Sequence, residues 1–275
     1  MKIESIKTKG FAISIIAFPI MLLAGFIMHP NLLKLEALQT VEQLVGRFHN
    51  QPVYHIGHLI VMFAVPVIMI SLISFMNVLQ SSGKRLGFWG GIIGLFGAFI
   101  LAVDKGALCL VLSAFDTLPE GQFQEFVPFL SVIVNKAGML WVVWLLPLLP
   151  IGAALQALGL FKEKFISKWQ TICIITGLLL LNNPDIEFIS AAGALLMCAG
   201  YIPWGVRILQ GRMKCSSTAC PLSLEKKIKT LHANNPVDDT SHANTNFAKN
   251  RVTATFLDLG KLDIIYRHFN HDFTQ

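Results

Sequence analysis

The stretch that decides the fold is residues 56–79, IGHLIVMFAVPVIMISLISFMNVL, which contains no charged side chain. As a helix it would be about 36 Å long, which exceeds the roughly 30 Å thickness of the hydrocarbon core of a bilayer. Pro66 lies inside the stretch, but a membrane helix tolerates a proline where neighbouring helices satisfy the freed carbonyl. The stretch therefore predicts a transmembrane helix.

The composition of the whole chain indicates the same class of protein. Of the 275 residues, 54% are hydrophobic and only 14% are charged, whereas about 25% of the residues of an ordinary soluble domain are charged. The many apolar residues exclude a disordered chain, and five cysteines are too few for a disulfide scaffold. The composition therefore predicts an all-α polytopic membrane protein whose main partner is the lipid bilayer.

Five other stretches resemble the first in length or in hydropathy. The stretch at 165–181 has the minimal length for a span, and the stretch at 132–161 must tilt or kink because it is long and contains two prolines. We therefore predict six transmembrane helices. Besides residues 56–79, they cover residues 11–28, 86–114, 132–161, 165–181 and 186–209.

The chain becomes more polar near Gln210. Residues 1–209 hold 13 basic and 10 acidic residues, whereas the much shorter segment 210–275 holds nine basic and six acidic ones. We therefore predict a transmembrane domain over residues 1–209, followed by a partly ordered cytoplasmic tail over residues 210–275.

The basic residues predict how the spans are oriented, because Lys and Arg resist translocation across a membrane. If the N-terminus is cytoplasmic, the outer loops carry only Lys34 and Arg47, and every cytoplasmic segment carries two or more basic residues. We therefore expect both termini in the cytoplasm. The same asymmetry explains the net positive charge of the chain, so a nucleic-acid partner is not implied.

Asp104, Lys105 and Lys136 are charged residues that fall inside predicted spans, farther from the span ends than Glu187 and Arg207. Charged groups within a bilayer are costly and usually functional. Asp104 and Lys136 should lie at similar depth, so we expect an ion pair between them, with Lys105 bound to another acceptor or extended toward the headgroups. The alternative is a buried pair that only fixes how the helices pack.

Three histidines lie at the predicted outer membrane face. His29 ends the first span, and His55 and His58 open the second with the i, i+3 spacing that two metal ligands on a helix use. A zinc or iron site of these histidines, with Asp104 as a further ligand, is one interpretation. The other is that the histidines cap helix ends or bind lipid headgroups.

The turn at residues 182–185 adds further polar groups at the same face. Its simplest role is to cap the last span, with Asp185 and Glu187 near the positive end of that helix. Together with the charged and histidine residues, the turn predicts a polar pocket that faces outward. The residues expected to line it are His29, His55, His58, Asp104, Lys136 and Asp185.

Glycines recur along one side of the third predicted span. Gly87 with Gly91, and Gly90 with Gly94, are four residues apart, which lets another helix approach closely. The Gly87–Gly97 ridge therefore predicts a helix-packing surface, and a homo-oligomer could use it.

Two short segments carry a resemblance to known proteins. Residues 25–30, GFIMHP, and residues 54–60, YHIGHLI, resemble small polytopic bacterial membrane proteins known only as domains of unknown function. The resemblance covers residues 11–209 and implies a bacterial inner (plasma) membrane, but no activity or site. The chain lacks the Ser, HxxxH and HxxxD pattern of the membrane zinc hydrolases that resemble ceramidases.

Three classes of function remain open. A non-enzymatic carrier or sensor of a small solute or ion would use Asp104 and Lys136. A metal-dependent membrane enzyme would use His29, His55, His58 and Asp104, and a structural or partner-binding protein would use the glycine ridge and the tail. We favour the non-enzymatic classes, because the sequence contains no nucleophile elbow, Walker loop or HExxH helix.

Overall fold

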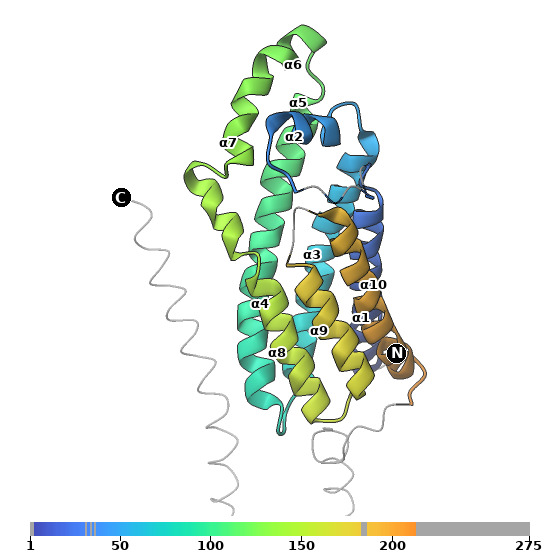
Figure 1. Ribbon diagram of the computed structural model, residues 1–275. Coiled ribbons are helices and arrows are strands. Elements are labelled where there is room, and N and C mark those ends of the chain that lie inside the picture. The colour runs from blue at the N-terminus through green and yellow to red at the C-terminus, as the bar shows by residue number, and fades with distance from the viewer. Residues whose placement is uncertain (1–2, 31, 34, 36, 183–185, 213–275) are drawn as a thin grey trace, which may run out of the picture. The chain divides into compact units, whose positions relative to one another are not determined.

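The computed structural model describes residues 3–212, apart from 31, 34, 36 and 183–185, and every regular element in these ranges is helical (Figure 1). The expected all-α class is confirmed. Asp185 and all but the first three residues of the predicted tail lie outside the described residues.

Five apolar helical segments are long enough to cross a membrane, so by helix length and composition the protein is a multi-pass membrane protein. Two of them are interrupted. Helix α4 continues through a π-helical turn, η1, into α5, and a 3₁₀ helix, η3, leads into α8. The segments are α1 (Ile3–Ile27), α3 (Pro52–Val78), α4 (Lys84–Asp104) with η1 (Lys105–Cys109) and α5 (Leu110–Phe115), η3 (Gly138–Leu145) with α8 (Leu148–Lys162), and α10 (Glu187–Leu209).

The span predicted at residues 165–181 is shorter than expected. Helix α9 (Lys168–Leu180) has 13 residues, which corresponds to about 20 Å and is less than the thickness of a bilayer core. It begins with a capping box in which Ser167 and Gln170 satisfy each other's backbone N–H groups. Gly177 of α9 packs against Gly193 of α10, so the short helix still returns the chain between α8 and α10.

Glycines let the long helices pair closely. A Cβ placed on Gly25 of α1 would lie 2.9 Å from the carbonyl oxygen of Gly57 of α3. The predicted ridge on α4 is used in the same way, since a Cβ on Gly90 would lie 2.6 Å from the carbonyl oxygen of Gly152 of α8. Helices α8 and α3 of the same chain therefore pack on the ridge, and a homo-oligomer that uses it stays a prediction.

The predicted helix over 132–161 is broken near its start. Lys136 has a positive φ of 48°, and the chain continues as the 3₁₀ helix η3 and becomes α-helical only after Pro147. In a bilayer, such irregular backbone is tolerated where it lines a cavity or is covered by protein.

Short helices form a cap beyond the end of the bundle at which α3 begins (Figure 1). The cap has its own apolar cluster, in which Leu44 and Phe48 of α2 pack with Phe123 and Leu130, and with Tyr54 of α3. We call this end of the bundle the cap end. The cap consists of α2 (Val41–Phe48), α6 (Glu120–Phe126), η2 (Val127–Leu130) and α7 (Ser131–Val134).

Candidate functional site

A cavity of about 310 Å³ lies between the long helices and the cap. Its part remote from the cap is lined mainly by apolar and aromatic side chains, among them Phe18, Phe75 and Tyr201. At the cap end, polar side chains join apolar ones such as Leu44 and Leu112 in the lining. The polar side chains there are His29, Arg47, Tyr54, His58, Asp104, Lys105, Lys136, Asn182, Glu187 and Ser190.

An ion pair between Arg47 and Glu187 closes the cap end of the cavity. Arg47 lies in α2 of the cap and Glu187 is the first residue of α10, and Arg47 Nη1 donates to Glu187 Oε1. The two side chains are only 12% and 4% exposed. Removing one partner of such a pair would leave a buried charge without compensation, so the pair ties the cap to the bundle.

Three aromatic rings surround this ion pair. His29 Nδ1 lies 3.3 Å from Glu187 Oε1, within ion-pair distance but outside hydrogen-bond geometry. The ring centroids of His29 and His58 are 4.6 Å apart, and those of Tyr54 and His58 are 4.2 Å apart. His58 Nδ1 lies 3.0 Å from the Tyr54 carbonyl oxygen, which can only accept. Nδ1 therefore carries the proton in the neutral ring, and Nε2 is the bare nitrogen.

Asp104 does not pair with Lys136. Its Oδ2 lies 2.9 Å from Nζ of the adjacent Lys105, and the Lys136 ammonium lies 4.3 Å from the ring centroid of Trp144. The expected ion pair is therefore wrong, because the chain breaks at Lys136 and Lys105 can fold back on its neighbour where α4 passes into the π-helical turn. Both acidic and basic partners still line the cavity, and π-helical turns are frequent at functional sites.

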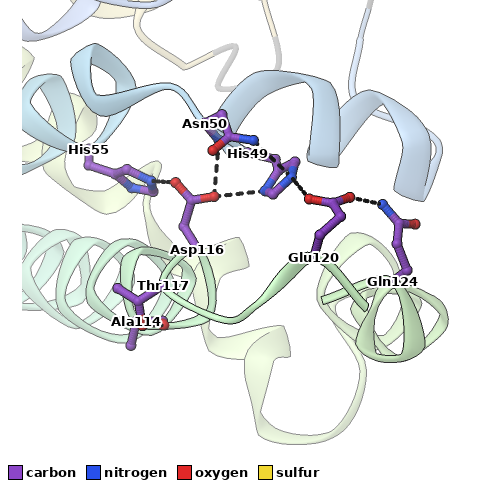
Figure 2. A network of polar contacts seen from close by, with 8 residues as sticks. All are labelled: His49, Asn50, His55, Ala114, Asp116, Thr117, Glu120 and Gln124. Carbon is purple, nitrogen blue, oxygen red and sulfur yellow. Dashed lines mark hydrogen bonds and ion pairs between the residues drawn. The ribbon is translucent and has the colours of Figure 1, made fainter. Parts of the chain in front are cut away.

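A second polar network lies in the cap, as Figure 2 shows. Asp116 Oδ1 accepts from the backbone N–H of Asn50 at 3.0 Å and lies 2.8 Å from His49 Nδ1, while Oδ2 lies 3.1 Å from His55 Nε2. His49 Nε2 in turn lies 3.3 Å from Glu120 Oε2. We call these five residues the cap network. It joins the loop before α3 to the segment after α5, more than 60 residues apart in the chain.

Asp116 is held in its ionised form by this network. Partial burial raises its pKa, but the Asn50 backbone N–H and the rings of His55 and His49 outweigh that effect, so the pKa of Asp116 lies below its ordinary value. The ring of His49 also stacks on Phe123, with centroids 3.8 Å apart and planes at 9°. Electrostatic and packing contacts therefore fix the same histidine.

The three predicted metal ligands do not converge. His29 and His58 meet at the cavity, whereas His55 turns to Asp116 in the cap network. Residues i and i+3 of a helix differ by about 60° in direction, which is enough to send His55 and His58 to different neighbours. Within the described residues, no group of three or more His, Cys, Asp or Glu side chains is placed to hold a metal ion.

The sequence pattern did not single out the Arg47–Glu187 pair or Asp116. Arg47 counted only as an outer positive charge, and Glu187 only as an acid near a helix start. One signal was available, because Glu187 is the only acidic residue within 186–209 and a carboxylate that opens an apolar helix requires a basic partner. The partner is 140 positions away, so spacing could not identify it.

The chain was also compared with known proteins. No family model, curated protein or solved structure matches it, so the resemblance to small bacterial membrane proteins stays a prediction and the site rests on its own geometry.

Proposed function

We propose that the protein is a non-enzymatic carrier or sensor that binds a small amphipathic molecule in the cavity. The observation that carries this proposal is that most polar side chains of the lining gather at the cap end, whereas the far part is mainly apolar. A ligand with an apolar body and a polar head matches this division. The volume of about 310 Å³ is at the lower end of the range of about 300–1,000 Å³ typical of small-molecule sites.

The surrounding structure supports binding within the membrane. One wall of the cavity is the 3₁₀ helix η3, whose Leu140, Val143 and Trp144 line it. Trp141 of the same segment does not line the cavity and is 52% exposed. Since irregular backbone at membrane depth is expected to line a cavity, we propose that η3 separates the ligand from the lipid.

The proposal includes the topology expected from the basic residues. Gly205 near the end of α10 packs against Ala12 near the start of α1, which supports placing both termini on one side, the cytoplasmic side of a bacterial inner membrane. Reporter fusions after Asn50 and after Ser82 test it. An active periplasmic reporter is expected only at Asn50, and the reverse pattern would contradict the topology.

The metal-enzyme alternative lacks comparable support. It needs His29, His55, His58 and Asp104 around one ion, but His55 is bound to Asp116 and Asp104 to Lys105. The structural alternative relied on the glycine ridge and on the tail. Helix α8 packs on the ridge, and all but the first three residues of the tail lie outside the described residues.

A photolabelling experiment tests ligand binding. The probe is a 12-carbon alcohol with a diazirine at the end of its chain, added to detergent-purified protein. Ala153→Phe places a large side chain in the cavity, and the matched control Ala199→Phe makes the same change at an exposed position of α10. We expect strong labelling of the wild type and the control, and little labelling of Ala153→Phe at equal thermal stability. Equal labelling of all three proteins would overturn the proposal.

A further inference from the structure

One oxygen at the polar end of the cavity lacks a partner. Glu187 Oε1 accepts from Arg47 and lies near His29, but Oε2 is buried and has no hydrogen-bond partner among the described residues. The side chain is 4% exposed and lines the cavity. A buried acceptor without a partner is unfavourable, the more so when it is charged, so a ligand that donates a hydrogen bond here would gain affinity.

Among the described residues of the lining, both acidic side chains have a basic partner. Arg47 neutralises Glu187, and Lys105 neutralises Asp104. Lys136 is the remaining cation of the lining, and it lies on Trp144, whose side chain is 66% exposed. An ammonium head would add an uncompensated charge to a buried site, and a carboxylate head would face the bare oxygen. An uncharged donor avoids both costs.

We infer that the ligand is a long-chain alcohol whose hydroxyl donates to Glu187 Oε2 and whose chain extends toward Phe75 and Tyr201. The inference rests on the proposed function, since it names the class of molecule that the same cavity binds. The hydroxyl satisfies the unpartnered oxygen without changing the charge of the site. The far wall offers apolar contacts, where the rings of Phe75 and Tyr201 stack 5.9 Å apart.

A series of probes with one chain and different heads tests the head group. Dodecanol, dodecanoate, dodecylammonium and dodecane compete with the diazirine alcohol for the purified protein. In the wild type we expect dodecanol to compete about tenfold better than the other three, which corresponds to one good hydrogen bond to a charged acceptor.

Two variants of Glu187 extend the test. Glu187→Gln replaces the charged acceptor with a neutral amide, so the advantage of dodecanol should fall. Dodecanoate should compete better than in the wild type, because the carboxylate that repels it is gone. Glu187→Asp keeps the charge but withdraws the oxygen by one methylene, so the advantage of dodecanol should fall while dodecanoate stays weak. The matched control is Asp116→Asn, which makes the same chemical change in the cap network and should leave the order of competitors unchanged.

The outcomes separate this inference from the proposed function. If no probe competes, the cavity is not a ligand site and both fail. If all four compete equally, or if an ion is preferred by the wild type, the cavity binds a chain but the hydroxyl inference is overturned. If Glu187→Gln does not fold, the ranking of the four competitors in the wild type and in Glu187→Asp still tests the hydroxyl inference.

Discussion

The cap network and the polar end of the cavity are both built around a carboxylate with histidine neighbours, but they differ in how many carboxylate oxygens have a partner. In the cap network, Asp116 has both oxygens bound, by His49 and Asn50 on one side and His55 on the other. At the cavity, Glu187 has one oxygen bound by Arg47 and one without a partner among the described residues. The carboxylate of Asp116 is committed to structure, whereas that of Glu187 retains the capacity to bind. Burial of a polar group does not by itself indicate a binding site. A buried carboxylate oxygen that lacks a hydrogen-bond donor and lies beside a cavity does.

The largest effect is expected from breaking the cavity ion pair. Arg47→Ala leaves the Glu187 carboxylate, which is 4% exposed, without its counter-charge. The expected loss in the free energy of unfolding is about 3–5 kcal/mol, measured by denaturant unfolding in detergent. The double variant Arg47→Leu/Glu187→Leu should recover most of it, because no buried charge remains. A stable single variant would contradict the role assigned to this pair.

A smaller loss is expected from breaking the cap network. Asp116→Ala removes the partner of His49, His55 and the Asn50 backbone N–H, and we expect a loss of about 1–3 kcal/mol because the Asp116 side chain is 13% exposed. Hydrogen exchange should show faster exchange at Asn50, while photolabelling of the cavity stays at the wild-type level. Loss of labelling with an intact bundle would show that the cap network belongs to the binding site.

The cap network should also weaken in acid. The pKa of Asp116 is lower in the folded protein than its ordinary value, so its contribution to stability is complete above the ordinary pKa and is lost as the pH falls through the folded one. The titratable groups that face it are His49 and His55, with Glu120 beyond His49. Protection of the Asn50 amide is expected to fall at a pH below about 4. The variant Asp116→Asn should not show this fall in protection. If it shows the same acid profile as the wild type, protonation of Asp116 is not the cause.

The smallest effect is expected at Lys136. Its ammonium lies against the ring of Trp144, which is 66% exposed, and exposed cation–π contacts contribute about 0.5–1 kcal/mol. Lys136→Met should therefore lower the free energy of unfolding by less than about 1 kcal/mol. Lys105→Met, which removes the partner of Asp104, serves as the comparison and should cost more. If Lys136→Met lowers the free energy of unfolding as much as Lys105→Met does, the result would support the Asp104–Lys136 ion pair expected from the sequence.

Hydropathy predicted the long helices, because an uncharged run such as 56–79 has few alternatives to crossing a bilayer. It could not predict that the chain breaks at Lys136, since that depends on how neighbouring helices pack. The sequence predicts one polar pocket for His29, His55, His58, Asp104, Lys136 and Asp185. In the structure His29, His58, Asp104 and Lys136 line one cavity. Contacts between residues far apart in the sequence cannot be read from spacing, so the pair of Arg47 and Glu187 was not expected.

The most direct test of the account is to map where the diazirine alcohol attaches to the wild-type protein. If the hydroxyl lies at Glu187, the reactive chain end reaches the far part of the cavity, and mass spectrometry should find adducts on the peptides that contain Phe75 of α3 and Tyr201 of α10. Adducts confined to side chains exposed on the outside of the bundle, such as Phe63 and Leu195, would show that the probe binds the surface and that the cavity is not a ligand site.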